Sequence, residues 1–369
     1  MIFYARIFAA VLVSLIAACT PRGEITLAPQ AADVGRLHSI FVSTTRALDA
    51  AGRFDSRRSP DPVYGRFTIS VPPDHKPGRI EWPHGKPDPA HDFLTVDRSL
   101  FASEKGFTRA LAGAIRSEPA DNREVIIFVH GYNNTFAEGL YRMAQLADDF
   151  DLPGIAVHYS WPSAGSPVGY GYDRDSMLFA RDGLEDLLTA VEKAGAKRIL
   201  LVGHSLGALL VMETLRQTAL EGRQDIRRHL RGVVLISPDI DIDIFKQQAR
   251  RIGKLPQPFL IFSSRRDRAL RLSAALTGQK ERLGSVSDVS ALAELRVTLF
   301  DVSEFSEGLS GHFIPATSPA LIKILANVRR LDSALQTGRP ARPGLVPGTI
   351  LTVQNATQII LSPVIGMAP

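Results

Sequence analysis

The segment "ILLVGHSLGALLVMETL" has the residue types and spacing of an activated serine nucleophile. Gly203, Ser205 and Gly207 form the pattern G-x-S-x-G, which an apolar run precedes and an apolar-periodic stretch follows. A serine at a sharp turn between a strand and a helix has strained dihedral angles, and its hydroxyl stands clear of the sheet. Side chains at 203 and 207 would collide across that turn. We expect Ser205 to be a nucleophile; the alternative is a structural turn.

A serine hydroxyl is a weak nucleophile unless a base takes its proton. When the serine lies at such a turn, an acid and then a histidine follow it along the chain. Of the nine histidines, only His312 in "SEGLSGHFIPA" follows the last apolar run at its carboxyl end. We assign His312 as the base; the alternative is a loop histidine bonded to backbone.

The acid of such a triad must orient the imidazole and stabilise its positive charge. Asp267 in "FLIFSSRRDRAL" lies five residues past one apolar run, and Asp239 in "LISPDIDIDIF" lies just past the run before it. Asp301 lies inside the final run. We favour Asp267 and keep Asp239 as the alternative acid.

His130 in "VIIFVHGYNNTF" is another candidate base, because it ends an apolar run. It precedes the nucleophile in the chain, however, whereas the base of this architecture follows it. We therefore expect the ring of His130 to brace its loop by hydrogen bonds, so that Gly131 and Tyr132 present backbone to a substrate.

Six apolar runs between residues 125 and 302 alternate with amphipathic stretches such as 177–194 and 206–220. Strands buried on both faces and separated by helices predict an α/β fold with a mostly parallel sheet flanked by helices. Upstream, "GRFTISV" alternates as a half-exposed antiparallel strand near an edge does, and the proline-rich stretch 72–92 predicts a long loop. About twenty residues separate the run ending near Ser237 from the next, so we expect no large cap domain.

The amino terminus, "MIFYARIFAAVLVSLIAAC", has the features of an export signal. Its apolar stretch, 7–18, is shorter than the ~20 residues that span a bilayer as a helix. "IAAC" resembles the lipobox of bacterial lipoproteins, which implies a signal peptide over 1–18 and a diacylglyceryl group on Cys19, the only cysteine. We expect a tether over 19–36 and a lipid anchor in the bacterial cell envelope. Thr20, where an aspartate would favour the inner membrane, points to the outer membrane of a Gram-negative cell.

The composition is that of a globular protein, with 45% hydrophobic and 22% charged residues. The net charge of +5 comes from short clusters of arginines and not from a long basic block. We therefore expect no nucleic-acid partner. No cluster of residues has the spacing of metal ligands, so we expect no metal and no cofactor. The sequence does not indicate the oligomeric state.

Several blocks together resemble a bacterial family of alpha/beta hydrolases of uncharacterised function. They are "HGYNN" at 130–134, "YSWPSAGS" at 159–166, "YDRDS" at 172–176, "VGHSLG" at 202–207, "SPDIDIDIF" at 237–245 and "YGRFTISVPPDHKPGRIEWP" at 64–83. The resemblance covers about residues 37–325 and implies serine-hydrolase chemistry with Ser205, Asp267 and His312 as the triad. It also implies an oxyanion hole formed by the backbone amides of Tyr132 and Leu206.

The blocks "YSWPSAGS" and "YDRDS" have two interpretations. In one, Trp161, Tyr170 or Tyr172 lines a substrate pocket. In the other, the first block is a rigid loop and Asp173 or Asp175 caps the next helix.

We predict a hydrolase domain over 37–330 and a loosely ordered tail over 331–369. The predicted function is that of a membrane-anchored serine hydrolase, most simply a carboxylesterase that cleaves small acyl esters. The alternatives are an acyltransferase or thioesterase with the same triad, or a non-catalytic envelope lipoprotein.

Overall fold

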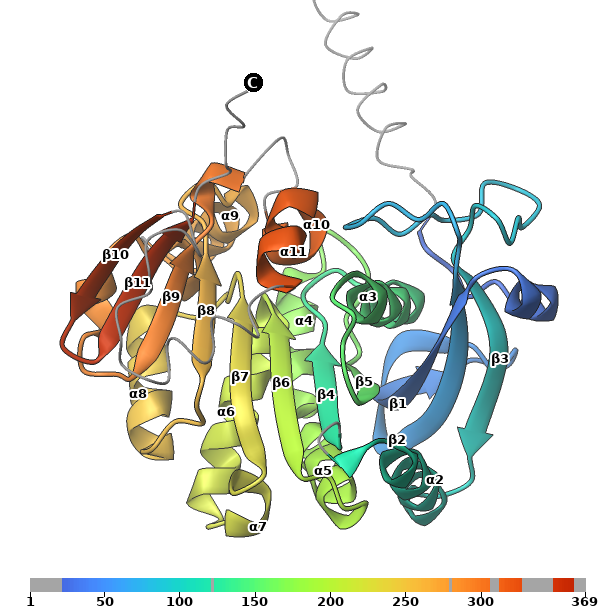
Figure 1. Ribbon diagram of the computed structural model, residues 1–369. Coiled ribbons are helices and arrows are strands. Elements are labelled where there is room, and N and C mark those ends of the chain that lie inside the picture. Colours follow the sequence, from blue (N-terminus) through green and yellow to red (C-terminus); the bar gives the residue numbers. More distant parts are fainter. Residues whose placement is uncertain (1–21, 121–122, 279–280, 306–311, 327–347, 362–369) are drawn as a thin grey trace, which may run out of the picture.

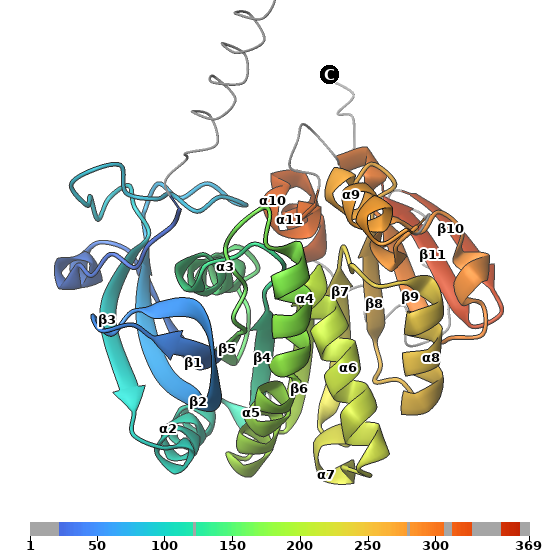
Figure 2. The ribbon, with the colours of Figure 1, turned by 180° about the vertical axis from the view of Figure 1, so that it is seen from behind.

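The computed structural model describes residues 22–120, 123–278, 281–305, 312–326 and 348–361. Within these ranges the chain forms an eleven-stranded sheet with helices on both faces (Figures 1 and 2). The strand order is β10-β11-β9-β8-β7-β6-β4-β5-β1-β2-β3. The expected α/β fold with a mostly parallel sheet is thus confirmed.

All six apolar runs of the sequence are strands, and each pairs in parallel with its neighbours among the six. They are β4 (Glu124–Val129), β5 (Ile155–Ser160), β6 (Arg198–His204), β7 (Leu230–Ile236), β8 (Phe259–Ser263) and β9 (Val297–Asp301). The carboxyl ends of parallel strands meet at one edge of a sheet, so the loops after these strands share that edge. We call it the carboxyl edge.

Helices cover the two faces unequally (Figures 1 and 2). One face carries α2 (Glu104–Ser117), α4 (Tyr170–Phe179), α5 (Arg181–Lys193), α6 (Leu206–Leu220), α7 (Gln224–Arg227) and α8 (Ile242–Ile252). The other carries α3 (Phe136–Asp149), α10 (Ile314–Thr317) and α11 (Pro319–Ala326), and α9 (Arg268–Leu276) follows β8 at the carboxyl edge. The expected helix over 206–220 is α6, whereas the stretch 177–194 is divided between α4 and α5 at Ala180.

Three strands before the parallel core extend the sheet on one side. β1 (Arg36–Leu48) pairs in parallel with β5 and antiparallel with β2 (Phe54–Val71), and β3 (Leu94–Phe101) pairs antiparallel with β2. The segment "GRFTISV" lies in β2, one strand in from the edge. Between β2 and β3, residues 72–93 contain no strand or helix, as the prolines predict.

The described part of the expected tether, 22–36, packs on the domain and is not a free linker. Ala28 and Ala31 are buried, and the 3₁₀ helix η1 (Pro29–Asp33) lies next to β3. The Arg22 side chain bonds to Asn133 and Glu138. At least one polar residue of the expected tether, Arg22, is therefore bound to the folded domain. Cys19 and the signal segment 1–18 lie outside the described residues.

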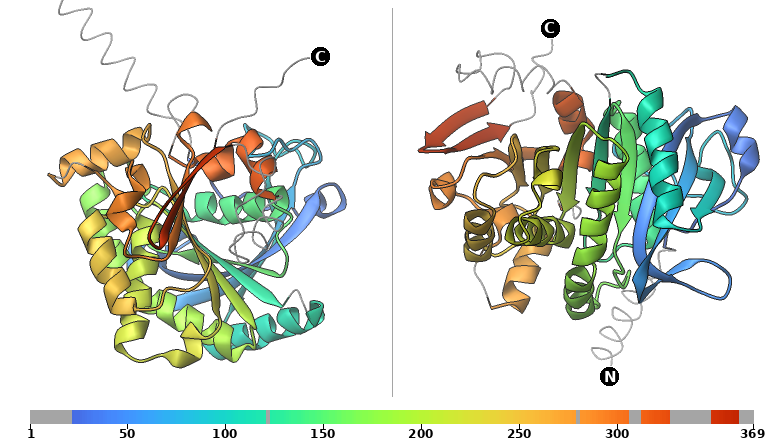
Figure 3. Two further views of the ribbon diagram at one scale, coloured as in Figure 1. Left: turned by 60° about the vertical axis from the view of Figure 1, so that its left-hand side comes forward. Right: turned by 90° about the horizontal axis from the view of Figure 1, so that it is seen from below.

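The expected tail contains a β-hairpin, so that prediction is wrong for residues 348–361. β10 (Gly348–Val353) and β11 (Ala356–Leu361) pair antiparallel, and β11 pairs in parallel with β9 (Figure 3). Gln354 and Asn355 form the two-residue turn, with Gln354 at φ 53°. Ile359 and Leu361 are buried against the apolar cluster of β8 and β9. The rest of 331–369 lies outside the described residues.

No large cap covers the carboxyl edge in the insertion between β7 and β8. These residues hold one helix, α8, as the short spacing predicts. The three 3₁₀ helices η3 (Leu283–Ser285), η4 (Val289–Leu292) and η5 (Ser303–Phe305) complete the described elements.

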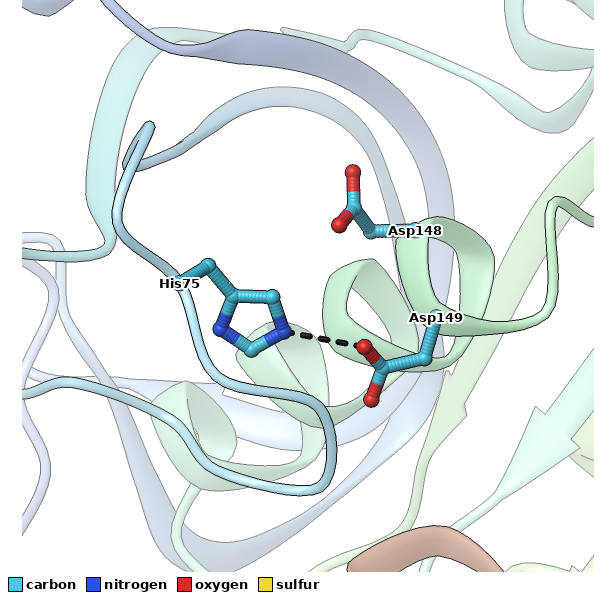
Figure 4. Close-up of side chains that lie close together, drawn as sticks. All are labelled: His75, Asp148 and Asp149. Atoms are coloured by element: carbon cyan, nitrogen blue, oxygen red, sulfur yellow. Dashed lines mark hydrogen bonds and ion pairs between the residues drawn. The ribbon is translucent and has the colours of Figure 1, made fainter. Parts of the chain in front are cut away.

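A buried histidine fastens the 72–92 loop to the end of α3. The Nε2 atom of His75 lies 3.0 Å from Asp149 Oδ1 (Figure 4), and its Nδ1 lies 2.8 Å from Glu81 Oε2. Burial lowers the pKa of His75, but the hydrogen bonds with Asp149 and Glu81 outweigh it and raise the pKa above its ordinary value. Below this raised pKa the ring is charged and bridges the two carboxylates.

This bridge predicts a pH-dependent stability. A histidine whose pKa is raised by folding stabilises the fold fully below its unfolded-state pKa and loses that effect as the pH rises through the folded-state pKa. We expect His75→Asn to lower the free energy of unfolding by about 3 kcal/mol at pH values below about 6, the low end for a buried pair because Glu81 is partly exposed. At alkaline pH the difference from wild type should shrink. Urea denaturation at several pH values measures it.

The exposed histidine of the same loop, His84, provides the control. His84→Asn should leave the free energy of unfolding unchanged at every pH. If the loss in His75→Asn is equal at acid and alkaline pH, the bridge does not depend on the charge of the ring.

Candidate active site

Ser205 lies between β6 and α6 with a strained backbone. Its φ is 52° and its ψ is −121°, a combination of backbone angles that residues other than glycine rarely adopt. A Cβ on Gly203 would lie 2.8 Å from Ala208 Cα, and one on Gly207 would lie 2.2 Å from the carbonyl oxygen of His130. Both glycines are therefore required by close approach, as the sequence pattern predicts, and the turn has the geometry of a nucleophile elbow.

The structure brings two of the predicted triad residues into direct contact. The Nδ1 of His312 lies 2.7 Å from Asp267 Oδ2. Asp267 is fully buried, whereas 24% of the His312 side chain is exposed. The second oxygen of Asp267 accepts a hydrogen bond from the Leu270 amide at the start of α9. The carboxylate is thus fixed by a helix end and can hold the ring of a solvent-accessible histidine in one orientation.

His312 lies directly beside the elbow. The ring of His204, the residue before Ser205, has its centroid 4.8 Å from that of His312. Its Nε2 lies 3.1 Å from the carbonyl oxygen of His312. Burial, followed by the proximity of His312, lowers the pKa of His204 well below its ordinary value, so the ring is neutral. Its Nε2–H can then donate to that carbonyl. His204 occupies a variable position of the G-x-S-x-G pattern, so the pattern itself gives no signal for its role in holding another loop.

Asp239, the alternative acid, is engaged elsewhere. Its Oδ1 accepts from Ser273 at 2.6 Å and lies 3.1 Å from Nε of the buried Arg282, and its Oδ2 accepts from the hydroxyl of Tyr170. Burial and then the charge of Asp239 raise the pKa of Tyr170 to about 12, which keeps that hydroxyl a donor. Asp239 therefore connects Tyr170 on α4 with Ser273 on α9 by hydrogen bonds and pairs with Arg282. The structure places Asp267, not Asp239, at His312.

The predicted oxyanion donors lie on either side of Ser205. The Leu206 amide is the first of α6 and has no acceptor within its own helix. A Cβ on Gly131 would lie 2.9 Å from Ser205 Cβ, so the Gly131 backbone lies against the nucleophile. The Gly131 carbonyl accepts from Asn134 and is within 2.9 Å of His130 Nδ1. Because a trans peptide directs N–H opposite to C=O, the Tyr132 amide points away from that pair.

His130 braces this loop and is not placed as a base. It is buried, and its Nε2 lies 3.0 Å from the carbonyl oxygen of Trp161. The Trp161 indole stacks on the ring at 4.9 Å and donates back to the His130 carbonyl at 2.7 Å. Burial, with Arg46 and His158 nearby, lowers the pKa of His130 well below its ordinary value. The neutral ring holds the loop in position.

Two buried charges that the sequence analysis did not assign to the site also position its loops. Arg46 on β1 donates to the carbonyls of Ser163 and Asn134 at 3.0 and 2.8 Å, and burial lowers its pKa to about 10. Asp173 on α4 accepts from the amides of Asn133 and Ala164. An arginine in a predicted strand gives no sequence signal for this role, because its partners are backbone groups of distant loops.

Neither interpretation of the aromatic blocks is right as a whole. Trp161 is fully buried beneath the loop and lines no open pocket. Tyr170 reaches Asp239, and Tyr172 donates to the Ser56 carbonyl. Asp173 lies within α4 and binds preceding loops, so it does not cap that helix.

One group of side chains has the composition of a metal site. His75, Asp148 and Asp149 have ligand atoms within 4.8 Å of one another (Figure 4). Asp148, however, binds Arg36 through both oxygens at 2.7 Å, and both nitrogens of His75 face carboxylates. These ligand atoms are already paired within the protein, so the group acts as a structural bridge.

The sheet order and the elbow are those of the alpha/beta-hydrolase fold. The chain belongs to the family of alpha/beta hydrolases of unknown function known as DUF900, whose model matches residues 103–329. The resemblance seen in the sequence is thereby confirmed at the level of the family. No curated protein matches the chain.

Solved esterase structures share this arrangement only distantly. A fungal esterase from Rhizomucor miehei is 15% identical, with 83% of this chain and 88% of that chain covered and a TM-score of 0.35. An esterase from Pyrococcus furiosus is 13% identical, with 86% and 96% covered and a TM-score of 0.34. Such low similarity carries no argument about activity.

Neutralising Asp267 and neutralising Asp239 should have different effects: the first on the reaction rate of Ser205, the second on the stability of the fold. Asp267→Asn should slow the reaction of Ser205 with a fluorophosphonate by about 10³-fold or more, because the ring of His312 loses its anionic partner. Asp239→Asn should slow the reaction little but lower the free energy of unfolding by about 3 kcal/mol, because Arg282 is left in a buried site without its carboxylate. Labelling rates and urea denaturation measure both.

Asp243→Asn, at an exposed aspartate on α8, is the matched control and should change neither quantity. Loss of labelling in Asp239→Asn alone, with the protein folded, would reverse the assignment.

Proposed function

We propose that the protein is a serine hydrolase that cleaves carboxylic acyl esters. The observation that carries the proposal is the hydrogen-bonded pair of Asp267 and His312 beside a serine in a strained elbow. A buried carboxylate, a partly exposed imidazole and a serine hydroxyl in this chain order are the components of acyl transfer through a covalent intermediate.

In this mechanism Ser205 Oγ attacks the ester carbonyl while His312 takes the hydroxyl proton. Asp267 holds the Nδ1–H of His312 and stabilises the imidazolium that forms. The amides of Leu206 and Tyr132 stabilise the oxyanion, each worth roughly 10²–10³ in rate. His312 then protonates the departing alkoxide, so that the alcohol leaves and an acyl-serine remains. Water, activated by His312, releases the carboxylic acid and restores Ser205.

We further propose that Cys19 carries a diacylglyceryl anchor. The motif "IAAC" and the use of a single cysteine support this. More than one acyl chain gives stable attachment to a membrane, whereas one chain does not. Within the described ranges no helix is long and apolar enough to cross a membrane.

The enzyme is tested by covalent labelling of the full chain with a fluorophosphonate, followed by hydrolysis of nitrophenyl esters of increasing chain length. Wild type should label and turn over, and Ser205→Ala should do neither while remaining folded. Ser264→Ala, at another buried serine after a strand, serves as the control that still labels. Folded wild-type protein that neither labels nor hydrolyses any ester would refute the proposal and favour a non-catalytic binding role. An acyl-serine that accumulates in water but is discharged by an added alcohol would instead identify an acyltransferase.

The anchor is tested by replacing its thiol. Cys19→Ser should appear in the soluble fraction or as unprocessed precursor, because no sulfur is left to alkylate. Wild type should sediment with membranes and incorporate labelled palmitate. Equal membrane association of the two proteins, without palmitate in either, would contradict lipidation.

A further inference from the structure

The residue nearest the proposed anchor in the described chain is bonded to the proposed active-site loop. Arg22 donates to the carbonyl of Asn133 and to its side-chain oxygen, both at 2.7 Å. It also donates to the Gly165 carbonyl and to Glu138 in the first turn of α3. Asn133 directly follows Tyr132, whose amide is a proposed oxyanion donor. The start of the described chain is thus fixed at the carboxyl edge (Figures 1 and 2).

Chain length then limits the distance from the anchor to the site. Only Thr20 and Pro21 lie between Cys19 and Arg22. Even a fully extended chain covers only about 11 Å over these three Cα–Cα steps. A diacylglyceryl group on Cys19 lies in the bilayer surface. The Arg22 end of the carboxyl edge therefore cannot lie more than about two turns of a helix from the membrane surface.

A second group of residues on the same edge has the chemistry of a membrane-surface helix. On α9, Leu272 and Leu276 are 62% and 63% exposed and lie four residues apart, so they share one face of the helix. Val168, 91% exposed, lies in the loop before α4. Tyr170, two residues further, and Ser273 on α9 both donate to Asp239, which keeps this loop and the helix together.

Basic side chains flank these leucines. Arg268 and Arg271 are exposed, and neither forms an ion pair within the described part of the chain. The segment α9, "RALRLSAAL", contains no acidic residue. Leucines beside arginines on one helix face fit the interface of an anionic membrane, where the apolar side chains enter and the guanidinium groups meet phosphates. A neutral protein partner would not require the arginines.

We propose that the carboxyl edge docks on the anionic membrane in which Cys19 is anchored, with Leu272, Leu276 and Val168 inserted into its surface. The membrane-docking surface, defined by these three residues with Arg268 and Arg271, lies next to Asp267, the cap of α9. Resting on the proposed hydrolase site, this surface assigns the substrate class: acyl esters resident in the membrane, whose carbonyl enters the site from the bilayer surface. The proposal requires no lid.

The single cysteine makes the docking surface directly measurable. Cys19 is blocked by its thioether, so Leu272→Cys gives the full chain one free thiol for a polarity-sensitive dye. The labelled protein is reconstituted by its own anchor into vesicles of phosphatidylcholine and phosphatidylglycerol. The emission should shift to shorter wavelength and be quenched by a spin label in the acyl chains. Leu220→Cys is the matched control: Leu220 is also an exposed leucine, 47% accessible, but ends α6 at the opposite edge of the sheet.

Two results would overturn docking. One is a dye at position 272 that responds no more than the dye at 220. The other is a dye at 272 that is equally shielded in detergent solution, because the face would then be covered by protein, either a second copy or another part of the chain. Fluorophosphonate labelling of the same samples reports the serine hydrolase independently, so failure of docking and failure of the enzyme are distinguishable.

The substrate class is tested with Leu272→Asp/Leu276→Asp. Hydrolysis of a diacylglycerol in the vesicles should fall by about tenfold or more, because two apolar side chains no longer enter the interface. Hydrolysis of a soluble nitrophenyl acetate should be unchanged. Equal losses on both substrates would show a structural effect, and no loss on either would show that the surface does not deliver substrate; either result contradicts the proposal.

Discussion

The site depends on one constraint, the backbone conformation of Ser205. A side chain at φ 52° costs free energy, and the fold holds it there by contacts on every side. The Ser205 amide donates to Ile236 on β7, and its carbonyl accepts from the amides of Ala208 and Asp239. Gly207 lets α6 start directly against the carbonyl of His130. The elbow therefore exists only when β4, β6 and β7 are paired in register.

From that constraint follows the placement of everything else at the carboxyl edge. The loop after β4 must approach Ser205 as backbone, which is why Gly131 stands there and why buried His130 and Asn134 hold its carbonyl. The loop after β8 supplies Asp267, fixed by the amide of Leu270. Each of these groups is held by a hydrogen bond to a neighbouring helix end or loop. Such groups are already oriented before the reaction, so no free energy of reorganisation is required in the transition state. This preorganisation is the condition for electrostatic stabilisation.

The sequence was sufficient for the parts of this arrangement that rest on local pattern. The six core strands and the elbow follow from apolar runs and from glycine spacing, and His312 follows from chain order in the fold. Chain order left both Asp267 and Asp239 open as the acid, and only the contact of Asp267 with His312 separates them. It was insufficient where partners are distant backbone groups. Arg46 binds carbonyls 88 and 117 residues away, and Asp173 binds amides of two loops. No spacing of residue types in the sequence therefore predicts the role of either side chain. The hairpin of β10 and β11 was missed for a different reason: its strands mix apolar and polar residues, and its turn, Gln354 and Asn355, lacks the glycine that marks most two-residue hairpin turns.

Arg22 connects the loops of the proposed active site to the amino-terminal segment of the described chain. Its guanidinium joins two loop carbonyls, of Asn133 and Gly165, to the Glu138 carboxylate at the start of α3. A long tether would let the domain turn freely above a membrane, whereas these bonds hold the chain at Arg22 against the domain. Orientation at a surface costs little once one edge is held there, since the apolar residues of α9 then meet the interface at high effective concentration. In the proposed arrangement these residues are too few to bind a membrane from solution, and an anchor on Cys19 would supply the proximity that they need.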